Sequence, residues 1–184
     1  MELCWPEREM LESYVDALRR SWSPNTLRPE ATAEELEQIR VDAVAFLASL
    51  VDREATGDPI TLPNGTQAAR LPGYRMWMWD GAFCGSISFR WQPGSSALPP
   101  YVLGHIGYSV VPWKEGRGYA KRALSLLLPM VKAEGLDHVE LSTDLGNIAS
   151  RKIIEANGGV MVGQVDDSPW HGPEPVLRYR IDLS

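Results

Sequence analysis

The chain has 184 residues and a formal net charge of −6, and 44% of its residues are hydrophobic. This composition is typical of a globular protein and excludes the disordered and collagen-like classes. A pI near 5.1 argues against bulk electrostatic binding to nucleic acid. Two cysteines, Cys4 and Cys84, are too few for a disulfide framework and match no zinc-ligand spacing. We therefore expect a cytoplasmic protein with no metal site.

The charge is unevenly distributed along the chain. Residues 1–60 contain 13 acidic and 6 basic residues, whereas Lys114, Arg117, Lys121 and Arg122 lie within nine residues of each other. The first residues lack the basic and apolar regions of a signal peptide. The longest apolar stretches are far shorter than the roughly 20 residues that span a bilayer. We expect neither a nucleic acid nor a membrane as partner.

Two helices are predicted at the start of the chain. Apolar residues recur at helical spacing over 10–18 and over 36–50, and Pro/Gly-containing turns end both runs. Thr32 and Glu35 have the spacing of a capping box, which predicts the start of the second helix. A link rich in proline, glycine and asparagine follows at 58–73.

The rest of the chain alternates between strand and helix patterns. Asp80-Gly81 predicts a tight hairpin between two strands. From residue 74 onward we expect, in chain order, strands 74–79, 82–91 and 102–111, helix 117–134, strand 138–143, helix 148–157, and strands 159–165 and 176–183. This order predicts an α/β (α+β mixed) domain whose mixed sheet contains one right-handed parallel crossover.

The segment VVPWKEGRGYAKRAL (110–124) is the strongest candidate site. It passes from a strand end, through Gly116 and Gly118, into a helix, whose free N–H groups and dipole favour phosphate oxygens. Glycine lets the backbone close around an anion, and the basic residues nearby add charge suited to a polyphosphate. The spacing is neither G-x-x-x-x-G-K-[ST] nor G-x-G-x-x-G. On this segment alone, a tight turn with solvated basic side chains stays open as the alternative.

The same loop resembles the pyrophosphate loop of the GNAT superfamily of acetyl-CoA-dependent N-acetyltransferases, Arg/Gln-x-x-Gly-x-Gly/Ala. EGRGYA (115–120) matches it at Gly118 and Ala120 and departs from it at Glu115. LSTDLGNIASRKIIEANGG (141–159) resembles the next strand–helix segment, in a form similar to a bacterial branch of predicted acetyltransferases. The resemblance covers roughly residues 74–183. It implies a GNAT-like central mixed twisted sheet flanked by helices, with an N-terminal helical extension.

The resemblance also implies a function and a set of binding residues. It implies direct transfer of an acetyl group from acetyl-CoA, as co-substrate, to a primary amine of a small molecule or peptide. One domain, 1–184, would combine a helical acceptor-side region (1–73) with an acetyl-CoA-binding core (74–184). The implied coenzyme contacts are the backbone of Ser109, Val110 and Val111, the loop residues Glu115, Gly116, Arg117, Gly118, Tyr119, Ala120 and Lys121, and Asn147 and Ser150. Asn147 also has the place of a helix N-cap.

The catalytic residues are less clearly indicated. His105 is the best-placed group with a suitable pKa for a general base, and a structural histidine is its alternative. Asp144 is a second candidate base, or a cap for the turn that follows it. The tyrosine acid of many relatives corresponds to Ile154 here. Tyr108 is therefore our candidate acid for the leaving thiolate, provided that its side chain faces the coenzyme.

Two other functions stay open. One is a non-catalytic acyl-CoA-binding sensor of the same fold, and the other is an interaction domain that uses the acidic N-terminal helices. The resemblance assigns the acceptor pocket to 1–73, 92–100 and 166–175, which carry no motif that identifies the amine. Their acidity would suit a cationic amine, although charged helix faces are usually only solvated. A homodimer also stays open.

Overall fold

The computed structural model describes residues 1–26, 28–62, 64–166 and 174–183. Every helix and strand expected from the sequence is present among them. Four short strands near the start of the chain, β1 to β4, were not expected. In chain order the elements are β1 (Glu2–Cys4), η1 (Arg8–Met10), α1 (Leu11–Arg19), α2 (Ala31–Ser49), β2 (Val51–Asp52), β3 (Ile60–Thr61), β4 (Gln67–Ala68), β5 (Gly73–Trp79), β6 (Phe83–Arg90), β7 (Ile106–Val110), η2 (Pro112–Lys114), α3 (Tyr119–Ala133), β8 (His138–Asp144), α4 (Ile148–Glu155), β9 (Val160–Val165) and β10 (Val176–Asp182).

The strands form two main sheets. The larger one has the order β1-β5-β6-β7, with β2 also paired to β5, and the smaller one has the order β8-β10-β9. All pairs within these sheets are antiparallel. The crossover β7-α3-β8 is present, but its two strands belong to different sheets. The expected α/β fold with strands and flanking helices is confirmed. The expected mixed sheet with a parallel crossover is wrong for the described strands, because β7 and β8 separate instead of pairing and all the described pairs are antiparallel.

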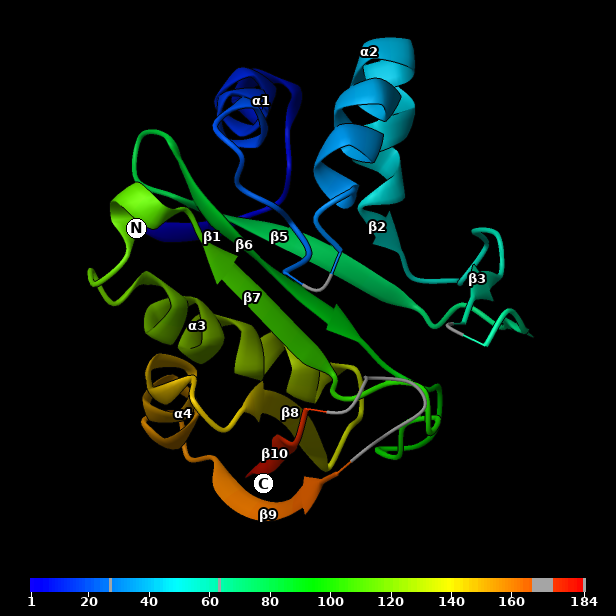
Figure 1. Ribbon diagram of the computed structural model, residues 1–184, viewed down its shortest axis with the longest axis vertical. Helices are drawn as coiled ribbons and strands as arrows, with labels where there is room; N and C mark the ends of the chain where they lie inside the picture. The colour runs from blue at the N-terminus through cyan, green and yellow to red at the C-terminus, as the bar shows by residue number, and fades with distance from the viewer. Residues whose placement is uncertain (27, 63, 167–173, 184) are drawn as a thin grey trace.

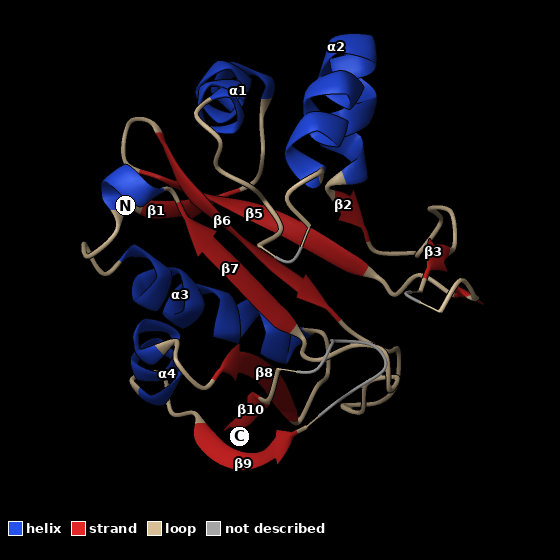
Figure 2. Cartoon of the chain, in the orientation of Figure 1, coloured by secondary structure: helices blue, strands red, loops and turns tan. Residues whose placement is uncertain are grey.

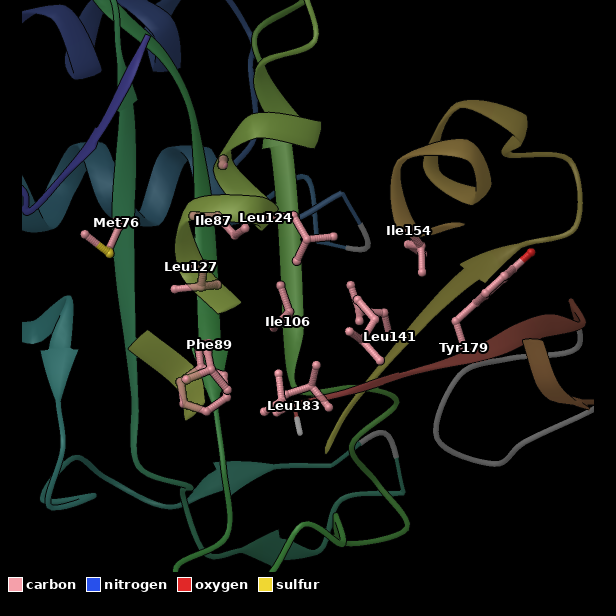
Figure 3. Packing of buried hydrophobic residues seen from close by; sticks show 14 of the residues in the cluster. Met76, Ile87, Phe89, Ile106, Leu124, Leu127, Leu141, Ile154, Tyr179 and Leu183 are labelled. Atoms are coloured by element: carbon pink, nitrogen blue, oxygen red, sulfur yellow. The ribbon is translucent and has the colours of Figure 1, made fainter. Parts of the chain in front are cut away.

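Helices cover both faces of the larger sheet. Helices α1 and α2 lie on one face, and α3 lies on the other, between the larger sheet and the smaller one (Figures 1 and 2). On the first face the Tyr14 ring stacks on Trp77, with ring centroids 4.6 Å apart. On the second face, Ile87 and Phe89 of β6 share a core cluster with Leu124 of α3 and with side chains of β8 and β10 (Figure 3).

The predicted capping box at the start of α2 is wrong. The N-cap of the helix is Glu30, two residues before Thr32, and the Thr32 hydroxyl donates to the Trp22 carbonyl at 3.2 Å. Glu35 points into the protein, where its carboxylate accepts from Arg75 at 2.8 Å and from the Tyr14 hydroxyl. A buried carboxylate needs a charged partner, so tertiary pairing replaces the local cap.

None of the described helices is long and apolar enough to cross a membrane. Most of the predicted acceptor segment 166–175 lies outside the described residues.

Candidate functional site

Strands β7 and β8 touch at one end only. The His105 N–H donates to the Glu140 carbonyl at 2.7 Å, and the Ser142 hydroxyl donates to the Leu103 carbonyl at 2.5 Å. Gly104 makes this approach possible, because an added Cβ would lie 3.0 Å from the Glu140 carbonyl oxygen. Beyond this contact β7 pairs only with β6 among the described strands. Residues 102–105, which were expected to begin the strand, instead form this junction.

The backbone of β7 therefore has a free edge. The Val111 N–H donates to the Cys84 carbonyl of the neighbouring strand at 2.9 Å, so it is not available there, contrary to our expectation. Backbone groups of successive residues in a strand point to opposite edges. The groups of Val110 and Tyr108 consequently point to the free edge, whereas Ser109 pairs with Ser86. Of the three predicted backbone contacts, this register favours Val110 and adds Tyr108.

The glycine loop lies directly after β7. Gly116 and Gly118 have φ angles of +74° and +75°, and Gly118 is the N-cap of α3. Glu115, before the two glycines, and Arg117, between them, are exposed. Lys121 in the first helical turn is exposed as well. The first N–H groups of a helix have no intrahelical partner, so they and the helix dipole favour an anion at this loop. Ala120 is buried and packs the helix start onto the sheet.

Lys114 does not contribute free charge to this loop, although the sequence grouped it with the other basic residues. Its ammonium lies 2.5 Å from one oxygen of Asp80 in the β5–β6 turn, and the Tyr119 hydroxyl donates to the other oxygen at 2.6 Å. These two hydrogen bonds hold the pKa of Asp80 well below its ordinary value. The exposed basic residues at the loop are therefore Arg117, Lys121 and Arg122.

Asp80 is a site residue that sequence reasoning missed. It was recognised as half of a turn pair, and nothing near it in the chain indicates that its carboxylate holds both ends of the glycine loop. That arrangement arises only when the β5–β6 turn packs beside the start of α3.

Helix α4 contributes the second group of predicted residues. Asn147 is its N-cap and accepts from the Ser150 N–H at 3.0 Å, so the capping alternative is confirmed. The Ser150 hydroxyl lies 2.9 Å from the Tyr108 hydroxyl. Tyr108 thus spans from β7 to α4, and burial raises the pKa of its hydroxyl. Ile154, at the position of the family's tyrosine, is 1% exposed and belongs to the core.

His105 holds the two sheets together. Its side chain is 0% exposed, and its Nδ1 accepts from the Glu140 N–H at 2.9 Å. A neutral imidazole that accepts at Nδ1 carries its proton on Nε2, so neither nitrogen is ready to take a proton from an amine. Burial lowers the pKa of His105 to about 4. This geometry favours the structural alternative over the predicted catalytic base.

Asp144 lies at the carboxyl end of β8 and is exposed. Its carbonyl accepts from the Asn147 N–H at 3.0 Å, which closes the turn into α4. The turn uses the backbone of Asp144, and the residue is exposed.

Residues 9–160 match the family model described as "Acetyltransferase (GNAT) domain". A search of curated proteins finds no match.

Solved structures give similar folds at low identity. A structure titled as a probable acetyltransferase is 19% identical, with a TM-score of 0.61, and the match covers 98% of this chain and 91% of that one. The microcin C7 self-immunity acetyltransferase, solved with acetyl-CoA and AMP, is 10% identical, with a TM-score of 0.61 and the same two coverages. A mutant of the spermidine N-acetyltransferase from Vibrio cholerae is 14% identical, with a TM-score of 0.60, and the match covers 100% of this chain and 96% of that one.

Proposed function

This chain belongs to the GNAT acetyltransferase family and is an acyltransferase, and on that premise we propose that it transfers an acetyl group from acetyl-CoA directly to a primary amine. The observation that carries the proposal is the adjacency of three features: the free edge of β7, the glycine loop, and the start of α4. The acetyl-CoA complex of the structurally similar microcin C7 immunity enzyme supports the choice of coenzyme.

The residues present fit that coenzyme. The N–H groups of the loop at Gly116 and Gly118, with Arg117 and Lys121 beside them, suit a pyrophosphate. The free backbone groups of Tyr108 and Val110 suit the amides of the pantetheine arm, which would pair with them as an added strand. Acetyl-CoA supplies an acetyl group already activated as a thioester.

We assign a proton-donating role to Tyr108. In the overall reaction a C–N bond forms, the C–S bond breaks, the amine loses a proton and the sulfur gains one. A phenol whose pKa is raised by burial stays protonated at neutral pH and can donate its proton to a thiolate. Asp144 is the remaining side-chain candidate to accept the proton of the amine, because it is exposed at the carboxyl end of β8.

We also propose that residues 1–73 form the acceptor side of a single domain. The Trp22 indole N–H donates to the Ser109 hydroxyl at 3.0 Å, on the face of β7 that carries α1 and α2. The connection between these helices therefore lies over the strand whose free edge is assigned to the coenzyme. An amine entering from this face would approach the side of β7 opposite α3.

Calorimetry with acetyl-CoA, followed by a thiol-release assay with a panel of amines, tests the proposal. The variant Gly118→Ala should weaken acetyl-CoA binding by roughly tenfold or more, because a Cβ at φ +75° strains the loop and obstructs the phosphate. Gly135→Ala is the matched control: Gly135 has φ +86° and follows the far end of α3. It should show a similar loss of stability, of about 1–2 kcal/mol, with unchanged acetyl-CoA affinity.

The outcomes separate the three functions. Binding with thiol release supports the acetyltransferase. Binding without release for any amine supports the acyl-CoA sensor instead. Absence of binding overturns both and leaves the interaction domain.

A further inference from the structure

The face of the larger sheet beneath α1 and α2 carries an arginine over the start of β7, at Gly107. Arg90 ends β6, and its Nη2 lies 3.8 Å from the position that a Cβ on Gly107 would occupy. The Ser88 hydroxyl donates to the Gly107 carbonyl at 3.3 Å. Because Gly107 has no side chain, the guanidinium reaches over the strand whose opposite edge is assigned to the coenzyme.

Arg90 has no acidic partner in the described part of the chain. No carboxylate there lies within ion-pairing distance of its guanidinium. The nearby Arg75 differs, since it pairs with Glu35 at 2.8 Å and with the Tyr14 hydroxyl at 3.3 Å. Arg75 is thus neutralised inside the protein, whereas Arg90 is an exposed residue with no ion pair among the described residues.

Several acidic residues of the N-terminal helices are paired with arginines other than Arg90. Arg28 pairs with Glu30 and Glu34, at 3.1 Å and 2.7 Å, and Arg40 pairs with Glu37 at 2.6 Å. Several of the acids that make this region negative are therefore engaged with arginines of the same region. On this face the Arg90 guanidinium is the charged group that lies against β7 at Gly107.

We propose that the acceptor amine also carries an oxyanionic group, a carboxylate or a phosphate, and that Arg90 binds this group. A guanidinium presents a planar pair of N–H donors that match both groups. The position above Gly107 would hold the oxyanion on one side of β7 while the amine reaches the thioester. The inference rests on the proposed function, which it deepens by naming the acceptor class: amino acids and amino phosphates, rather than polyamines.

The test uses amines that share one carbon skeleton. Each set contains an α-amino acid, its carboxamide, its decarboxylated amine and the corresponding aminophosphonate, with spermidine as the polycationic comparison. Thiol release is measured for the wild type, Arg90→Gln, Arg90→Lys and the control Arg40→Gln, which removes an exposed arginine of α2. Far-UV circular dichroism and acetyl-CoA calorimetry check that each variant folds and binds the coenzyme.

We expect the wild type to prefer the members with an oxyanion. In Arg90→Gln the KM for these members should rise by about 10- to 100-fold, as expected for a lost charge-assisted pair, with a smaller change in kcat. Arg90→Lys should recover part of the loss, and Arg40→Gln should match the wild type. A preference for the carboxylate or for the phosphonate identifies the source of the oxyanion.

The inference is overturned if acetyl-CoA binds but the amides, decarboxylated amines or spermidine are used as well as the acidic members, or if no acidic member is used. It is also overturned if Arg90→Gln keeps the wild-type preference. Failure of acetyl-CoA to bind the wild type is a separate result, because it rejects the proposed function itself.

Discussion

The hydroxyl of Tyr108 is the side-chain group on which the proposed chemistry most depends. It comes from β7, where its backbone also faces the free edge, and it meets Ser150 of α4. The other position considered for the acid, on α4, is the buried Ile154, which has no proton to donate.

Replacing Tyr108 with phenylalanine should lower kcat by roughly 10- to 100-fold, because the leaving thiolate loses its proton donor. Acetyl-CoA affinity measured by calorimetry should change little. Tyr101→Phe is the control, since the Tyr101 hydroxyl donates to the Ala69 carbonyl at 3.1 Å in an exposed loop. An unchanged kcat in Tyr108→Phe would mean that water protonates the sulfur.

His105 gives a prediction about stability and pH. Its pKa is about 4 in the folded protein, against an ordinary value of 6.5. Between these values the unfolded chain binds more protons than the folded one, so the free energy of unfolding should fall as the pH falls from 6.5 to 4, by up to about 3 kcal/mol. Chemical denaturation at a series of pH values measures this.

The variant His105→Asn supplies the comparison, because an amide oxygen can still accept from the Glu140 N–H. Its unfolding free energy should depend less on pH in this window, and the pH profile of kcat should keep the shape of the wild type. A fall of about 100-fold in kcat, together with loss of the acidic limb, would restore His105 as the general base.

Among the elements, the β5–β6 turn and the start of α3 act as one unit. Asp80 receives hydrogen bonds from Lys114 and Tyr119, at either side of the glycine loop. Both Asp80 and Lys114 are mostly buried, with 19% and 14% of their side chains exposed. The loop that is assigned to the phosphates is thus positioned by a turn distant from it in the sequence.

Asp80→Asn should lower the free energy of unfolding by about 1–2 kcal/mol and weaken acetyl-CoA binding several-fold, because the loop loses its anchor. Thermal unfolding and calorimetry measure the two effects. Asp58→Asn, which changes an exposed acid in the 58–73 link, should alter neither.

The pKa of Asp80 is depressed in the folded protein, so its contribution to the free energy of unfolding is present above the ordinary pKa of 3.8. This contribution is lost as the pH falls below that value. A coenzyme affinity that stays unchanged in Asp80→Asn would contradict the anchoring role.

At the scale of the whole molecule, the N-terminal helices and the sheet depend on each other. The strand β1 pairs with β5, and Tyr14, Trp22 and Phe46 share a core cluster with Trp77. The buried set of Glu35, Tyr14 and Arg75 joins α1, α2 and β5. The helical region is therefore part of the domain core.

Glu35→Ala should lower the free energy of unfolding by about 2–4 kcal/mol, since it leaves the Arg75 guanidinium without its partner in a poorly solvated position. The double variant Glu35→Met/Arg75→Met should recover much of this loss. Glu37→Ala is the matched control on the same helix and should have little effect, because its pair with Arg40 is exposed. Denaturant titration measures all three, and equal losses for Glu35→Ala and Glu37→Ala would contradict the argument.

The sequence by itself determined the helices, the longer strands and the position of the glycine loop. Periodicity, turn residues and the glycines at 116 and 118 act over a few neighbouring residues, so a linear pattern is enough to reveal them. The same locality explains why Asn147 could be predicted as a helix cap.

Only the tertiary structure decided how charges and strand edges are paired. The roles of Glu35, Lys114 and His105 depend on partners 30 to 40 residues away, which no local pattern encodes. Whether β7 and β8 pair or separate likewise depends on the close approach at Gly104. A buried charge or backbone group takes the best partner that the folded chain offers, and that partner is known only once the chain is folded.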